Sequence, residues 1–538
     1  MVCCISYSSS NPWNHPFVIK KNMKSVFNNS AELEAKVKTE FNVPQFVMME
    51  NAAIGMKNLI VEKFSNTDKA SSLPVIIVCG KGNNGADGYA LARHLQPFFQ
   101  VSLVAFEEPK SQEAKIWHST CQKLAIPFLS VSDFYNLSSS KKNKAIIVDC
   151  IYGIGFHGEL SSDAASLIAA MNDFNGPKIA CDIPSAFEFC ADYTITMGTL
   201  KLQLFSDKAK QACGNIIVAD LGFAPEVFES QGQTTAYCIE QDDLKLPFRK
   251  NRNAHKGTYG HAVIFAGDKA GAGILAASAA INFGAGLTSI LKTHQSNLEQ
   301  FKIDPQLMIA DSIPKKATAI LIGPGVTQHL QTDNQMIMDW FQKTKNPALV
   351  LDAGMFDFEQ IASFLKELNN VENSRIILTP HLLELSRLLK KVASQFPETG
   401  ITQEDCDVKN LADNPETKIK VGKILNQLYP NTAVIMKSAN TFIAYGKECY
   451  IVTQGCQNLA KGGSGDILAG LCVSLLAQGY KARDAAISAS LAHALASQKL
   501  GAESFNVTSE VLINTIWNTK INPPDFTTCH FLKPHKLF

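Results

Sequence analysis

The chain has 538 residues, of which 46% are hydrophobic and 18% are charged. This is enough apolar material for buried cores and too little charge for a disordered chain, and at about 100–200 residues per domain it favours two large domains. The 50 basic and 49 acidic residues leave a net charge of +1. Such a balance gives no support to a long basic surface, so we expect neither nucleic acid nor a membrane as a partner.

The cysteines and the start of the chain bear on its compartment. None of the 14 cysteines forms a C-x-x-C pair, and several lie in apolar runs, such as Cys79, Cys150 and Cys181. This pattern predicts small buried thiols in a reducing compartment. The first residues lack the basic start and apolar core of a secretory signal. The uncharged stretch 270–291 is rich in small residues and fits a buried helix followed by a strand better than a membrane span. We expect a cytoplasmic protein.

Strand-like runs alternate with helical patterns through the first half. A leading helix is expected over roughly 30–64. The run PVIIVCG at 74–80 is continuous, apolar and closed by glycine, which is typical of a parallel strand buried on both faces. The runs VSLVAF, AIIVDC, PKIACDIP, YTITMG and NIIVAD continue the series. This alternation predicts a doubly wound α/β sandwich of three layers.

A polar, irregular stretch up to about residue 253 separates this series from a second one. We place the boundary near residue 241, which gives domains 1–240 and 241–538. The second series includes GHAVIFAG, ATAILIGPG, ALVLDAG, RIILTPH and TAVIMKSA, and a hairpin-like pair, TFIAYG and CYIVTQG, follows it. Repeated strand–helix units predict a second three-layer αβα sandwich.

The first candidate site is the loop GKGNNGADG at 80–88, which follows a predicted strand and opens a predicted helix. Its G-x-G-x-x-G spacing allows a diphosphate to approach a helix N-terminus, and Glu107 and Glu108 lie where a ribose-binding acid is expected. A nicotinamide-dependent dehydrogenase is therefore one interpretation. Against it, Asn83, Asn84 and Asp87 crowd one turn, where such loops usually carry small or apolar residues.

Polar side chains also end two further predicted strands. Asp149 follows AIIV, and Asp182 and Ser185 follow KIAC. Because the carboxyl ends of parallel strands share one edge of a sheet, these side chains can converge with Asn84. Each aspartate alone could cap a turn, but several polar strand ends in one half favour a site.

The motifs CGKGNNGADGYALARHL, VDCIYGIGFHGEL, CDIPS and NIIVADLGFAP resemble the N-terminal domain of bifunctional NAD(P)HX repair enzymes of the YjeF/Nnr type. The resemblance implies a Rossmann-like epimerase that acts on the C6-hydrated nicotinamide ring of damaged NADH or NADPH. It implies a potassium ion on Asn84, Asp149 and Ser185, whose oxygens suit a hard cation, and Asp149 or Asp182 as the carboxylate that moves protons. The implied substrate contacts are Asn83, Asn84, Gly85, Ala86, Asp87, Gly153, Ile154, Gly155, Phe156, His157, Gly158, Glu159 and Asp182.

The first half departs from the family pattern at two glycines. Ala86 replaces the second glycine of N-N-G-G-D-G, and Ala186 stands where D-I-P-S-G ends in glycine. A methyl group matters there if the backbone needs a positive φ or a close ligand approach. The loop 187–191 is also shorter than is usual in the family.

The sharpest motif is AKGGSGDILAG at 460–470. A glycine run opens directly into an apolar helix, so backbone N–H groups point at an anion, and Asp466 can accept a proton from a hydroxyl beside that anion. This layout suits phosphoryl transfer, although no G-K-[ST] follows as in a Walker A loop. The alternative is that Gly465 and Asp466 only cap the helix.

Together with IGPG, LVLDA, ILTPHLLEL and KSANT, this motif resembles the ADP-dependent NAD(P)HX dehydratase, a ribokinase-like domain that is the usual fusion partner of the epimerase. The resemblance implies that a nucleotide, with Mg²⁺, phosphorylates the C6 hydroxyl and that elimination follows. Asp466 is implied as the base. The implied contacts are Ala276, Gly325, His381 and Asp466 for the hydrated dinucleotide, and Lys437, Ser438, Ala439, Asn440, Thr441 and Gly465 for the nucleotide.

Several alternatives stay open at this point. His381 could be a structural cap, and Lys461 adds a positive charge where the family has threonine. The chain could also be another ribokinase-like kinase with a binding module, or a degenerate binding protein. For the leading interpretation we expect NADHX, NADPHX and ADP as small-molecule partners, a homo-oligomer, and ADP in preference to ATP because both activities are fused in one chain.

Overall fold

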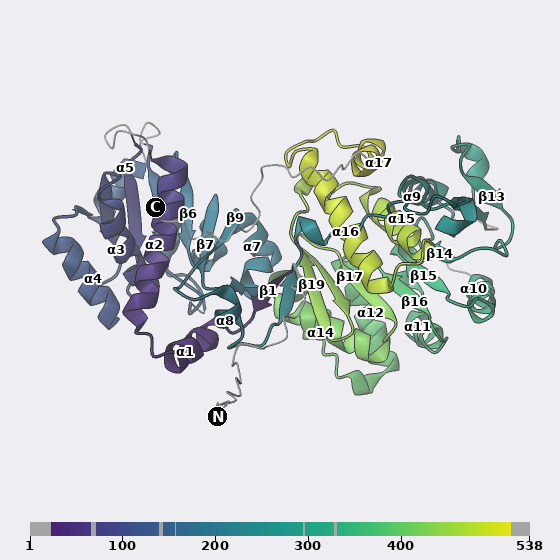
Figure 1. Cartoon of the computed structure of the whole chain (residues 1–538), viewed down its shortest axis with the longest axis horizontal. Coiled ribbons are helices and arrows are strands. Elements are labelled where there is room, and N and C mark those ends of the chain that lie inside the picture. The colour runs from purple at the N-terminus through teal and green to yellow at the C-terminus, as the bar shows by residue number, and fades with distance from the viewer. Residues whose placement is uncertain are drawn as a thin grey trace, which may run out of the picture.

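The structure is a computed structural model that describes residues 23–65, 72–138, 144–156, 158–293, 296–327 and 331–517. Two α/β bodies lie side by side, the first half of the chain in one and the second half in the other (Figure 1). Each has a central sheet with helices on both faces, so both predicted sandwiches are confirmed.

The sheet of the first half has seven parallel strands in the order β4-β3-β2-β5-β6-β7-β9. These strands are β2 (Val75–Cys79), β3 (Val101–Ala105), β4 (Phe128–Leu129), β5 (Ile146–Cys150), β6 (Lys178–Cys181), β7 (Tyr193–Met197) and β9 (Asn215–Ala219). Separate apolar clusters lie on its two faces. The helices are α1 (Ser30–Glu40), α2 (Gln45–Phe64), α3 (Asn83–Leu95), α4 (Gln112–Lys123), α5 (Val131–Ser138), α6 (Ser162–Asn172), α7 (Asp207–Ala212) and α8 (Pro225–Glu229).

The second sheet has twelve strands in the order β13-β12-β11-β14-β15-β16-β17-β18-β19-β10-β1-β8. Its second-half strands are β11 (His261–Ala266), β12 (Leu287–Lys292), β13 (Met308–Ala310), β14 (Ala319–Ile322), β15 (Ala348–Leu351), β16 (Arg375–Leu378), β17 (Thr432–Met436), β18 (Thr441–Tyr445) and β19 (Glu448–Val452). Their helices are α9 (Ala270–Asn282), α10 (Gln331–Lys343), α11 (Ile361–Asn369), α12 (Leu382–Gln395), α13 (Val408–Asp413), α14 (Pro415–Leu428), α15 (Ser464–Ala477), α16 (Ala482–Lys499) and α17 (Ser509–Trp517).

Three strands of the first 240 residues complete this second sheet. β10 (Ala236–Cys238) runs parallel to β19, β1 (Lys24–Phe27) runs antiparallel to β10, and β8 (Leu200–Lys201) runs parallel to β1. The label of β1 lies between the two bodies in Figure 1. One hydrogen-bonded sheet therefore crosses the predicted boundary near residue 241, and the first half is anchored to the second by backbone pairing.

Two local expectations can be compared with the structure. The leading helix expected over 30–64 is wrong as a single element, because α1 ends at Glu40 and α2 begins at Gln45. Asn42 has a φ of 52°, and Pro44 caps α2 with an extended backbone, so the chain turns there. The helix and strand expected over 270–291 are confirmed as α9 and β12. Within the described ranges, no helix has the length and apolar character needed to cross a bilayer.

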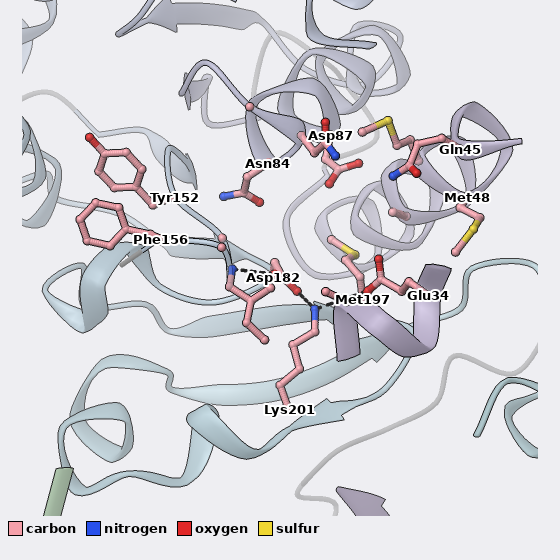
Figure 2. A pocket seen from close by; sticks show the side chains of 18 of the residues that line it. Glu34, Gln45, Met48, Asn84, Asp87, Tyr152, Phe156, Asp182, Met197 and Lys201 are labelled. Carbon is pink, nitrogen blue, oxygen red and sulfur yellow. Dashed lines mark hydrogen bonds and ion pairs between the residues drawn. The ribbon is translucent and has the colours of Figure 1, made fainter. Parts of the chain in front are cut away.

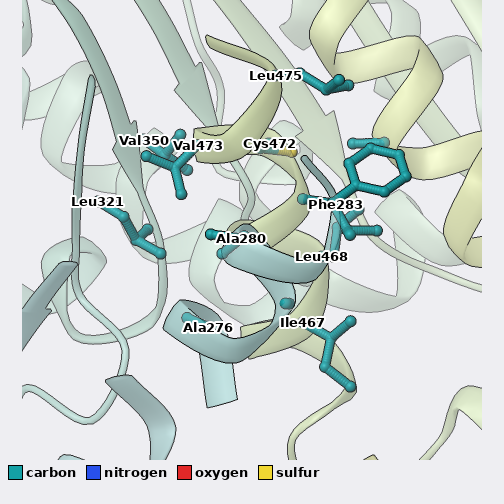
Figure 3. Close-up of a cluster of buried hydrophobic side chains, with 14 of the residues drawn as sticks. Ala276, Ala280, Phe283, Leu321, Val350, Ile467, Leu468, Cys472, Val473 and Leu475 are labelled. Carbon is teal, nitrogen blue, oxygen red and sulfur yellow. The ribbon is translucent and has the colours of Figure 1, made fainter. Parts of the chain in front are cut away.

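Helices α9 and α15 pack in close contact, and a glycine makes this possible. A β-carbon on Gly470 of α15 would lie 2.3 Å from the carbonyl oxygen of Ala276 and 2.8 Å from the β-carbon of Ala279, both on α9. Figure 3 shows Ala276 in this apolar contact with Ile467 and Leu468 nearby. The packing holds α15, and with it the predicted glycine-rich motif, against the sheet.

We predict that Gly470→Ala lowers the stability of the second half by about 1–3 kcal/mol, because an added methyl group in a filled core forces the helices apart. Gly271→Ala is the matched control on α9, since its β-carbon would meet Phe301 at an ordinary 3.5 Å. Urea unfolding midpoints of both variants measure the difference. Equal midpoints for the two variants would show that the α9–α15 contact is not tight.

Two candidate active sites

A cavity of 530 Å³ opens at the carboxyl ends of β2, β5 and β6. Figure 2 shows it from close by, with Asn84 and Asp87 at the start of α3 and with Glu34, Asp182 and Lys201 opposite them. The predicted substrate residues that line it are Asn83, Asn84, Asp87, Gly153, Ile154, Gly155, Phe156 and Asp182. These residues therefore lie together at one edge of the sheet, as their positions at the strand ends predict.

Other residues of the same prediction do not line this cavity. Gly85 and Ala86 face inward: a β-carbon on Gly85 would lie 2.0 Å from the carbonyl oxygen of Gly80, and the side chain of Ala86 is fully buried in α3. Gly158 and Glu159 line a separate cavity of 490 Å³. His157 lies outside the described residues.

A buried ion pair forms the floor of the first cavity. Lys201 on β8 donates to Asp182, whose other carboxylate oxygen accepts the N–H of Ile154 at 3.3 Å, and a Glu34 oxygen lies 3.9 Å from the ammonium nitrogen. The Lys201 side chain is only 1% exposed. Burial lowers the pKa of Lys201, but the carboxylates of Asp182 and Glu34 outweigh it and raise that pKa above its usual value. Asp182 holds a φ of 69°, a conformation that costs a non-glycine residue free energy and marks functional sites.

Lys201 and Glu34 were not found from the sequence. Lys201 stands alone in the apolar run LKLQLF, and a single charge in such a run is a signal for a buried, paired group. Glu34 carries no such signal, because acidic residues are common on exposed helix faces. Burial raises the pKa of Glu34 and also that of Asp87, which lies in the same cavity.

Asp149 and Ser185 form a tight unit behind this cavity. One carboxylate oxygen of Asp149 accepts the Ser185 hydroxyl at 2.7 Å and the Ile151 N–H at 3.1 Å, and the other accepts the Ser185 N–H at 2.7 Å. Burial raises the pKa of Asp149 to about 6, although these hydrogen bonds oppose the rise. Among the described residues, Asn84 finds no hydrogen-bond partner for its buried amide oxygen or nitrogen.

The loop after Ser185 is strained. Ala186 has a φ of 53° and Phe187 one of 54°, both in the left-handed region. Glycine adopts this region freely, whereas alanine does so at a cost. The expected consequence of alanine in place of the family's glycine is therefore confirmed for Ala186. It is not found for Ala86, which lies within a regular helix.

The second candidate site surrounds Asp466 in the first turn of α15. Gly463 caps this helix with a φ of 91°, and a β-carbon on Gly465 would lie 3.4 Å from the ammonium nitrogen of Lys437. That nitrogen is 3.1 Å from Asp352 and 4.0 Å from Glu384. Burial raises the pKa of Asp466 to about 6, the charge of Asp352 adds to the rise, and Lys437 opposes it. Asp466 is thus a carboxylate of raised basicity beside a cation.

The three other predicted dinucleotide contacts, His381, Gly325 and Ala276, differ in how far they are buried. His381 caps α12, since its ring accepts the Glu384 N–H at 3.3 Å, yet its side chain remains 51% exposed and can serve both roles. Gly325 has a φ of 68°, and a β-carbon there would lie 2.2 Å from the Lys269 carbonyl oxygen. The Ala276 side chain is fully buried in the α9–α15 contact, so it does not face a cavity in this structure, and its predicted ligand contact stays a prediction.

The predicted nucleotide loop, 437–441, connects β17 to β18. Ala439 is exposed, whereas Asn440 is 2% exposed. The Ser438 hydroxyl donates to the Asn440 carbonyl oxygen at 2.7 Å, which fixes the turn, and the Lys437 N–H donates to Pro380 at 2.9 Å. The loop therefore lies beside the start of α12 and, through Lys437, beside Asp466.

Comparison with known proteins identifies the family. A family model described as NAD(P)H-hydrate dehydratase matches residues 262–518, and one described as YjeF-related protein N-terminus matches residues 45–203. The bifunctional NAD(P)H-hydrate repair enzyme Nnr of Helicobacter pylori is 34% identical over 484 residues, which cover 88% of this chain and 96% of that protein. The chain belongs to the family of bifunctional NAD(P)H-hydrate repair enzymes.

Two further similar proteins have a lower identity to this chain. The Escherichia coli enzyme of the same name is 27% identical over 451 residues, covering 79% of this chain and 81% of its own length. Among solved structures, an ADP/ATP-dependent NAD(P)H-hydrate dehydratase from Bacillus subtilis, co-crystallized with ATP/Mg²⁺, is 23% identical with a TM-score of 0.39. It covers 50% of this chain and 92% of its own.

Proposed function

We propose that this chain repairs hydrated NADH and NADPH by two activities, an epimerase in its first half and a nucleotide-dependent dehydratase in its second. The observation that supports this most is the placement of Asp466 beside Lys437 at a glycine-lined helix start, in a chain that belongs to the repair family. A base, a cation and a helix N-terminus are the parts that phosphoryl transfer requires.

In the dehydratase, Asp466 accepts the proton of the C6 hydroxyl while that oxygen attacks the terminal phosphorus of the nucleotide. The bond from phosphorus to the nucleotide's bridging oxygen breaks, and Lys437 and the N–H groups of the glycine-rich turn balance the charge. The new phosphate then leaves C6 with its bonding electrons, and C5 loses a proton, which restores the dihydronicotinamide. Mg²⁺ bound to the nucleotide's phosphates would neutralise part of their charge. The nearby carboxylates of Asp352 and Glu384 face Lys437.

In the epimerase, the C6 hydroxyl sits on a carbon next to the ring nitrogen, whose lone pair can expel it as water. Water that returns from the opposite face inverts C6. Asp182 and Lys201 carry these protons, since both line the cavity, whereas Asp149 is not among its lining residues. Glu34, with its raised pKa, supplies the acid that helps the hydroxyl leave.

A potassium ion fits beside this cavity. The buried amide oxygen of Asn84 lacks a partner among the described residues, and oxygen donors are what a hard cation prefers. Asn84, Asp149 and Ser185 would hold the ion, and its charge would help to keep Asp149 ionised. The described residues contain no cluster of three or more histidine, cysteine, aspartate or glutamate side chains that could hold a different metal.

Four further expectations stay predictions within this proposal. ADP is the expected phosphoryl donor, a homo-oligomer is the expected assembly, and the cytoplasm is the expected location. The residues 1–240 and 241–538 are the expected units of the two activities.

We predict that Asp466→Asn slows nucleotide-dependent recovery of NADH from the S-form hydrate by about 100- to 10,000-fold, the usual contribution of a general base. Thermal stabilisation by ADP stays, because the amide keeps the shape of the side chain. In the wild-type chain, the rate falls as the pH drops through about 6, where Asp466 gains its proton. A full rate in the variant, or a flat rate between pH 5 and 7 in the wild type, would show that Asp466 is not the base.

A second prediction concerns Lys201→Met, which keeps the length of the side chain and removes its charge. Conversion of the R-form falls by about 100-fold or more, because the proton path is broken, while dehydration of the S-form continues at its normal rate. The second activity reports that the variant is folded. Lys57→Met, at a partly exposed position of α2 outside the cavity, is the matched control. Normal use of the R-form by Lys201→Met would remove this lysine from the mechanism.

A further inference from the structure

The predicted nucleotide loop, 437–441, is held by residues from outside its own half of the chain. The segment 205–210, which contains the end of the 3₁₀ helix Leu202–Phe205 and the start of α7, lies against it. Three hydrogen-bonding side chains connect the segment to the second half, and two of them connect it to this loop.

Lys418 of α14 is the centre of the first connection. Its ammonium nitrogen donates to the Asp207 carboxylate at 3.0 Å and to the Ser438 hydroxyl at 2.8 Å, and it lies 4.9 Å from the centre of the Phe442 ring. The Lys418 side chain is 0% exposed and that of Asp207 is 24% exposed. Burial lowers the pKa of Lys418, and the charge of Asp207 opposes this. A buried ammonium needs such a partner, so Asp207 keeps Lys418 charged and in place.

The Ser438 hydroxyl both accepts and donates a hydrogen bond in this arrangement. It accepts from Lys418 and donates to the Asn440 carbonyl oxygen at 2.7 Å. Asn440 is held in turn, because its amide donates to the Phe205 carbonyl oxygen at 3.1 Å. Both ends of the turn are thus tied to the segment 205–210, and Lys210 adds a hydrogen bond to the Thr453 carbonyl oxygen just beyond β19.

The continuous sheet brings this segment to the loop. β8 is the last strand of the twelve-stranded sheet, and the chain passes from Lys201 on β8 through the short helix Leu202–Phe205 to Asp207. The proposed proton carrier of the epimerase and the partner of Lys418 are therefore only six positions apart in the chain, on opposite sides of one short helix.

We propose that Asp207 and Lys418 are positioning residues of the dehydratase, through which the first half of the chain sets the nucleotide loop for ADP binding. This inference rests on the proposed function and adds to it that the dehydratase site is complete only when the epimerase half is docked. The nucleotide itself is contacted by the loop, and Asp207 and Lys418 act on it through Ser438.

The test uses the full chain with Asp207→Asn and, separately, Lys418→Met. The KM for ADP, measured at saturating S-form hydrate by absorbance of the dihydronicotinamide, rises by about 5- to 150-fold in each, the usual range for coupling between sites. The kcat, the KM for the hydrate and the epimerase rate stay at the wild-type values. Asp207→Glu, which retains the carboxylate, restores most of the ADP affinity.

The matched control is Lys420→Met. Lys420 lies on the same helix and pairs with Asp405 at 2.7 Å, but this pair is formed within the second half and Lys420 is 51% exposed. Its KM for ADP stays unchanged. In the double variant of Asp207 and Lys418 the KM is no higher than in Lys418→Met alone, because both changes remove the same connection.

An unchanged KM for ADP in both single variants overturns the proposal. A fall in kcat together with a rise in the KM of both substrates also overturns it, because this result indicates general disruption of the fold. A wild-type chain without nucleotide-dependent recovery contradicts the proposed function together with this inference, whereas normal wild-type activity with unaffected variants contradicts the positioning role alone.

Discussion

Backbone pairing between the two halves of the chain is the constraint on which the rest of the structure depends. Without β10, β1 and β8, the second sheet would end at β19 with an unpaired edge. The pairing buries that edge, and it also fixes where β8 lies. Because Lys201 is on β8 and Asp207 follows soon after, the same pairing places one end of this segment in the epimerase cavity and the other at the nucleotide loop.

Both sites contain a lysine that facing carboxylates keep charged, and its side chain is 1% exposed for Lys201 and 20% exposed for Lys437. Lys201 meets Asp182 and Glu34, and Lys437 meets Asp352 and Glu384. An ammonium group that is removed from water without a partner destabilises the fold. Each lysine and its carboxylates therefore hold one another in place. Burial raises the pKa of Asp466 beside the second of these pairs, and the charge of Lys437 opposes that rise. The two chemistries, proton shuttling and phosphoryl transfer, thus rest on the same electrostatic arrangement.

Much of the fold follows from sequence patterns that act locally. Apolar strands closed by glycine predict the parallel strands of both sheets, and polar residues at strand ends predict the cavity around Asn84 and Asp182. What the sequence does not reveal depends on non-local contacts. β1, β8 and β10 are only two to four residues long, so no periodicity marks them. β10 pairs with β19, which lies more than two hundred positions further along the chain.

Individual residues show the same limit. Pro44 and Asn42 were available as signals for the break between α1 and α2. The resemblance implies a ligand contact for Ala276, and only the packing against Gly470 shows that its side chain lies in the core. Lys418 and Asp207 come from different halves of the chain, and no spacing relates them. Such partners are found only when the tertiary structure brings them together.

The most direct test of the account is a single reaction with the purified chain, excess ADP and an equal mixture of the R- and S-forms of hydrated NADH. Absorbance of the dihydronicotinamide follows the recovery against a reaction without protein. We expect both forms to be converted completely, because the first half feeds the second. Recovery that stops when the S-form is exhausted would contradict the epimerase, and no recovery at all would contradict the account as a whole.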